Sequence, residues 1–111
     1  MVTLKDVQAS PIVNAFIDKG NQHLGAMGFT DHGRLHLALV SRLSQEILLK
    51  LDYDKRLAEL AGIAGYMHDI GNVINRAGHS QSGALMAMEI LGRMGMDPAE
   101  IAIISAAIDN H

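Results

Sequence analysis

The sequence predicts an all-α fold, a compact bundle of about five helices. Apolar residues recur every three or four positions along most of the chain, a spacing that gathers them on one face of a helix. No segment shows clear strand-like alternation of apolar and polar residues. Turn-forming residues divide the chain into helical segments at 11 to about 25–28, 32–51, 55 to about 68–71, 80–94, and 98 to the end, with a loop over 72–78.

Residues suited to cap helices stand at the expected boundaries. Ser10 and Asp97 each precede a proline, which favours the first position of a helix. Asp31 and Asp54 offer a carboxylate that could cap the second and third helices. Gly95 is expected to end the fourth helix, because glycine readily takes the left-handed conformation found there.

The composition limits the chemistry open to the chain. Without cysteine, any metal must bind through nitrogen and oxygen. The net charge of −3 comes from 9 basic and 12 acidic residues spread without blocks, which argues against nucleic acid as a partner. The sequence lacks a targeting signal and an apolar run of the roughly 18 residues that span a bilayer. We therefore expect a cytoplasmic protein without a membrane partner.

The second helix is predicted to bury one apolar face. Leu39, Val40, Leu43 and Ile47 recur at helical spacing. His36 stands four residues before Val40 and shares that face. An imidazole would therefore lie at one end of the stripe.

Three predicted helices carry a histidine at one end of an apolar stripe, namely His36, His68 and His111. A single histidine in such a place is more often a partly buried side chain with an ordinary hydrogen-bond partner. Three together favour a metal ion, because one cation can satisfy several buried imidazoles at once. Asp69 adds a carboxylate that could bridge two cations. These residues predict a mononuclear or dinuclear site for divalent cations.

The segment after Asp69 offers further polar side chains. His79 follows His68 by 11 residues, and the glycines and asparagines between them could fold it back toward that histidine. Arg76 and His32 are candidate contacts for a substrate phosphate. For Arg76, an exposed side chain without such a role stays an equal alternative.

Residues 68–71 read His-Asp-Ile-Gly, and this run resembles the HD superfamily of metal-dependent phosphohydrolases. The segments that carry the resemblance are 30–36, 65–72, 78–84 and 104–111. The resemblance implies an HD-domain bundle in which His36, His68 and Asp69 hold a first metal ion. His79 and His111 would complete a second site, bridged by Asp69.

Two positions depart from the family pattern. Lysine usually follows the His-Asp-Ile-Gly run, whereas this chain has Asn72. The family's distal aspartate lies beyond the last histidine, whereas the sequence stops at His111, and Asp109 is too close to His111 to replace it. We therefore expect residues 1–111 to form a single HD domain that lacks its C-terminal portion.

The resemblance implies hydrolysis of a phosphomonoester or phosphodiester in a phosphorylated small molecule or nucleotide. A metal-activated hydroxide would attack phosphorus, with His68 and Asp69 as catalytic residues. Ligation by nitrogen and oxygen suits Fe, Mn, Ni, Co or Zn without distinguishing them. Three alternatives stay open: a signalling or interaction module without turnover, a metal-dependent ribonuclease, and a helix bundle with incidental histidines. A homo-oligomer is compatible with all of them.

Overall fold

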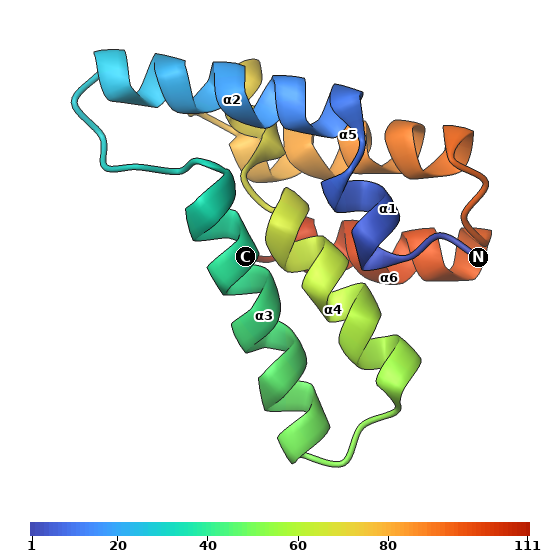
Figure 1. Ribbon diagram of the computed structural model, residues 1–111. Coiled ribbons are helices and arrows are strands. Elements are labelled where there is room, and N and C mark those ends of the chain that lie inside the picture. The colour runs from blue at the N-terminus through green and yellow to red at the C-terminus, as the bar shows by residue number, and fades with distance from the viewer.

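The computed structural model describes all of residues 1–111 and is entirely helical, which confirms the all-α prediction (Figure 1). No helix in it is both long enough and apolar enough to cross a bilayer. The elements are α1 (Leu4–Gln8), α2 (Pro11–Ala26), α3 (Arg34–Lys50), α4 (Lys55–Met67), the 3-10 helix η1 (Ile70–Val73), α5 (His79–Arg93) and α6 (Pro98–Asp109).

The helices pack in pairs around a shared apolar core. Helices α3 and α4 form an antiparallel hairpin, and α5 packs against α6 (Figure 1). Helix α4 also contacts α6, while η1 lies between α2 and α5. The core between them contains the fully buried side chains of Ile63, Met67, Leu91, Ile104 and Ile108. This arrangement brings the end of α4, the start of α5 and the end of α6 together.

Most of the predicted helix starts are confirmed. Ser10, Asp54 and Asp97 are the N-caps of α2, α4 and α6, and each side chain accepts a hydrogen bond from an amide of the first turn. Gly95 follows α5 with a φ of +88°, as expected for a glycine that ends a helix.

Three local details differ from the prediction. The short helix α1 was not predicted; Thr3 and Asp6 form its capping box. The Asp31 carboxylate accepts from the Gly33 amide at 3.0 Å and so forms a turn, and Gly33 is the N-cap of α3. The predicted loop over 72–78 is partly helical, because η1 extends into it.

The apolar face predicted for the second helix is wrong. Leu43 is 45% exposed and Ile47 is 58% exposed, whereas Leu37 and Ser41 are buried. Small residues decide which face turns inward: a methyl group on Gly65 of α4 would lie only 3.2 Å from the Ser41 Cα. The backbones of α3 and α4 therefore approach closely at Ser41, and Leu43 and Ile47 face outward.

A second close approach places the start of α5. A methyl group on Gly71 of η1 would overlap the His79 carbonyl oxygen and lie 2.7 Å from the Gly83 amide nitrogen. Both neighbours are backbone atoms, which cannot move aside by changing a side-chain rotamer. The lack of a side chain at Gly71 therefore sets the position of His79.

We predict that Gly71→Ala lowers the free energy of unfolding by about 1–3 kcal/mol or more, because the methyl group must push α5 away from η1. Urea denaturation measures this change. Gly92→Ala is the matched control: nothing lies within 4 Å of the added methyl group, and alanine in a helix should gain about 0.5–1 kcal/mol. Equal stabilities of the two variants would contradict the close approach.

Candidate metal centre

The candidate site is built around the buried carboxylate of Asp69, which lies between the end of α4 and η1. Four histidine rings have a nitrogen close to it. The distances to an Asp69 oxygen are 2.7 Å from His32 Nδ1, 3.4 Å from His68 Nε2, 3.3 Å from His79 Nε2 and 3.6 Å from His111 Nε2. Segments far apart in the sequence therefore meet at one carboxylate.

Three of these histidines are held in the same way. In each ring, Nδ1 lies within hydrogen-bond distance of the backbone carbonyl three residues earlier. The pairs are His68 with Gly65 at 2.6 Å, His79 with Arg76 at 3.0 Å and His111 with Ile108 at 2.5 Å. A carbonyl oxygen only accepts hydrogen bonds, so Nδ1 carries the proton and donates in each case.

This arrangement directs three lone pairs at one place. A neutral imidazole protonated at Nδ1 has its lone pair at Nε2. The Nε2 atoms of His79 and His111 are only 3.1 Å apart, and neither carries a hydrogen in this state. The Asp69 oxygens, which are also acceptors, lie beside them. Such a cluster of electron-rich atoms requires a cation or extra protons to neutralise it.

The fourth histidine plays a different part. His32 Nδ1 is 2.7 Å from Asp69 Oδ2, and because an ionised carboxylate only accepts, the ring donates this hydrogen bond. Sequence reasoning proposed His32 as a substrate contact and did not foresee this bond. The sequence offered one hint: His32 lies four residues before His36, a spacing at which two side chains can lie near each other.

The surroundings shift the pKa values of the two central groups. Burial lowers the pKa of His68 more than the hydrogen bond with Gly65 raises it, so the ring is neutral near pH 7. Burial raises the pKa of Asp69, but His68, His32 and His79 together lower it by a larger amount, so the pKa lies below its ordinary value. A neutral imidazole beside an ionised carboxylate is the state in which both bind metal.

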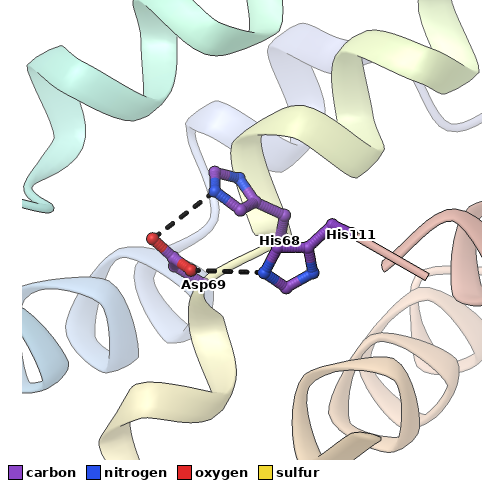
Figure 2. Close-up of side chains that lie close together, drawn as sticks. All are labelled: His68, Asp69 and His111. Carbon is purple, nitrogen blue, oxygen red and sulfur yellow. Dashed lines mark ion pairs between the residues drawn. The ribbon is translucent and has the colours of Figure 1, made fainter. Parts of the chain in front are cut away.

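The residues present fit a divalent cation. The ligand atoms of His68, Asp69 and His111 all lie within 4.8 Å of one another, and Figure 2 shows the carboxylate beside the two rings, with one oxygen directed at each. His79 joins this group through its contacts with Asp69 and His111. Metal-binding histidines commonly donate their second ring nitrogen to a backbone carbonyl, as three do here.

Two other predicted residues lie at the margin of this group. His36 is exposed, with its ring centroid 6.0 Å from that of His32. Arg76 Nη1 lies 4.0 Å from Asp69 Oδ1 and donates to Asn72 Oδ1 at 3.3 Å. The Arg76 guanidinium also lies 5.4 Å from the centre of the Phe29 ring, over its face.

The chain belongs to the HD domain family, whose model matches residues 35–111. The matched region contains His36, His68, Asp69, His79 and His111. The uncharacterized protein MJ1020 of Methanocaldococcus jannaschii is 27% identical over 95 residues, an alignment that covers 71% of this chain and 36% of that protein. The match thus spans about a third of the relative's length. No solved structure gives a significant match.

We predict that His79→Ala and His111→Ala each weaken metal binding at least about tenfold, since even the residues that orient metal ligands contribute that much. The measurement is the amount of Mn²⁺ or Co²⁺ retained after dialysis. His23→Ala, an exposed histidine on α2, is the control and should retain as much metal as the unchanged protein. Equal retention in all three variants would rule out metal ligation by His79 and His111.

Proposed function

We propose that this protein is a metal-dependent phosphohydrolase that cleaves a phosphomonoester or phosphodiester bond in a nucleotide-like substrate. The ligands would be His36, His68, Asp69, His79 and His111, for one or two ions of Fe, Mn, Ni, Co or Zn. One observation carries the proposal: the Nε2 atoms of three histidines converge on the Asp69 carboxylate. Membership of the HD domain family supports hydrolysis as the use of such a site.

The chain's own residues divide the task. A bound divalent cation would lower the pKa of a bound water molecule toward neutral pH and would attract the phosphoryl oxygens. Asp69 supplies the negative charge that offsets the cation, and its lowered pKa keeps it ionised. The neutral ring of His68 offers its lone pair. Both groups would act as metal ligands, and neither would form a covalent intermediate with the substrate.

Arg76 is placed to contact the phosphate. Its guanidinium lies 4.0 Å from the Asp69 carboxylate, so a phosphoryl group beside that carboxylate would come within its reach. The hydrogen bond to Asn72 and the stacking on Phe29 limit the positions that the guanidinium can take. Arginine can bind phosphate through two parallel hydrogen bonds. We propose that Asn72 contributes by orienting Arg76.

We propose different roles for His32, which precedes α3, and His36, which lies in the first turn of α3. His36 would be a metal ligand, and His32 would be a positioning residue that orients Asp69 through its hydrogen bond. We also propose that the same ring of His32 contacts the substrate phosphate, as the sequence predicts. The two roles predict different effects on metal binding.

We predict that His36→Ala lowers the number of metal ions bound per chain or abolishes binding at one site. His32→Ala should leave the number unchanged and weaken affinity about 10–100-fold, as loss of a residue that orients a ligand does. Isothermal titration calorimetry with Mn²⁺ measures the number of ions bound per chain separately from their affinity. A full complement of ions with unchanged affinity in His36→Ala would remove His36 from the ligand set.

The proposed activity is tested with p-nitrophenyl phosphate and bis-p-nitrophenyl phosphate in the presence of Mn²⁺. We predict that His68→Ala and Asp69→Ala reduce kcat/KM at least about a hundredfold, because each removes a direct ligand and ligand-orienting residues alone contribute about 10–100-fold. Glu89→Ala, which removes an exposed carboxylate, should leave the rate unchanged.

Metal content is measured on the same samples. A protein that binds metal through His68 and Asp69 yet hydrolyses neither ester would contradict the hydrolase proposal and favour a binding or signalling module. Hydrolysis that persists in both variants would show that the activity arises elsewhere.

A further inference from the structure

A cavity of about 390 Å³ opens directly beside the candidate metal centre. His68 and His111 form one wall of it, so the cavity and the centre share two rings. The remaining wall comes from three helices: Val40 of α3, Ala61 and Ala64 of α4, and Ala107 of α6. Its volume lies in the range of about 300–1,000 Å³ that is usual for small-molecule sites.

The lining indicates what kind of group would fit. Apart from the two histidines it contains no ionisable side chain. The hydroxyl of Ser44, the other polar side chain in the wall, donates to the Val40 carbonyl at 2.8 Å and has no proton left for a ligand. Few groups in the wall can replace the hydrogen bonds that a charged or sugar-like group makes with water. An apolar group would lose none.

The cavity contrasts with the part of the site around Arg76 and Asn72. There Arg76 and Asn72 offer a positive charge and an amide. A phosphoester placed with its phosphoryl group at the metal centre and near Arg76 would have the cavity available for its organic part. The site is thus polar where a phosphate would lie and apolar where the esterified group would lie.

We propose that this cavity binds the uncharged, apolar organic group, aromatic or alkyl, that is esterified to the phosphate. The inference rests on the proposed phosphohydrolase function and narrows its substrate, because the group esterified directly to the phosphate would be apolar in place of the sugar of a nucleotide. Small side chains leave room for the group, and filling the space should exclude it.

The experiment compares 1-naphthyl phosphate with glycerol phosphate in the full chain with Mn²⁺. Ala107→Leu and Ala61→Leu fill the cavity from α6 and from α4. Each should raise KM for 1-naphthyl phosphate at least about tenfold, since a single methylene group discriminates about 10–200-fold in an apolar pocket. KM for glycerol phosphate should change less than about twofold. Ala106→Leu, exposed on α6 outside the cavity, is the matched control and should change neither value.

A binding measurement separates this inference from the proposed activity. Fluorescence of 1-naphthol reports binding to the cavity without any turnover. Weaker binding in both filled variants than in Ala106→Leu supports the cavity even if no ester is hydrolysed. Equal 1-naphthol binding in all variants, or an equal rise in KM for both esters, would overturn it. So would a wild-type dimer, seen by sedimentation, that the filled variants disrupt, because a second copy would then occupy the groove.

Discussion

The structure depends on keeping an ionised carboxylate buried among imidazoles whose lone pairs point at it. A buried charge is costly unless it is paired, and Asp69 has a single hydrogen-bonded partner at 2.7 Å, His32. The other three rings approach it with Nε2, and a neutral ring with its proton on Nδ1 has no hydrogen there to donate. A cation at this place would satisfy the carboxylate and the rings together. This requirement explains why residues from four separate segments meet there.

Helix ends supply the geometry for this meeting. The last carbonyls of an α-helix have no amide partner within the helix. His68 is the C-cap of α4 and His111 follows α6, so that each ring can donate to such a carbonyl, of Gly65 and Ile108 respectively. Groups left unsatisfied by helix formation thereby fix the tautomer and the direction of the ring. The same local rule operates twice, on helices that pack side by side.

The sequence predicted the features that short-range chemistry determines. The caps at Ser10, Asp54 and Asp97 were correct because a side chain and the amides it binds are within one turn. The inward face of α3 was predicted wrongly because the close approach of Gly65 to Ser41 depends on a helix elsewhere in the chain. The meeting of His68, Asp69 and His111 was predicted from helical spacing and from the family resemblance. The hydrogen bond from His32 to Asp69 and the carbonyl that orients each ring are visible only in the folded structure.

The cluster of acceptors also links metal binding to stability. Lone pairs held close together destabilise the folded chain relative to the unfolded chain, in which the same groups separate and are hydrated. A cation that binds the folded site and not the dispersed ligands would remove this penalty and stabilise the fold by an amount that grows with the logarithm of its concentration relative to its Kd. The close packing at Gly71, which fixes His79, and the cap positions of His68 and His111 maintain the arrangement against that repulsion. The apolar core between α4, α5 and α6 therefore stabilises a cluster that is itself unfavourable unless a cation or extra protons neutralise it.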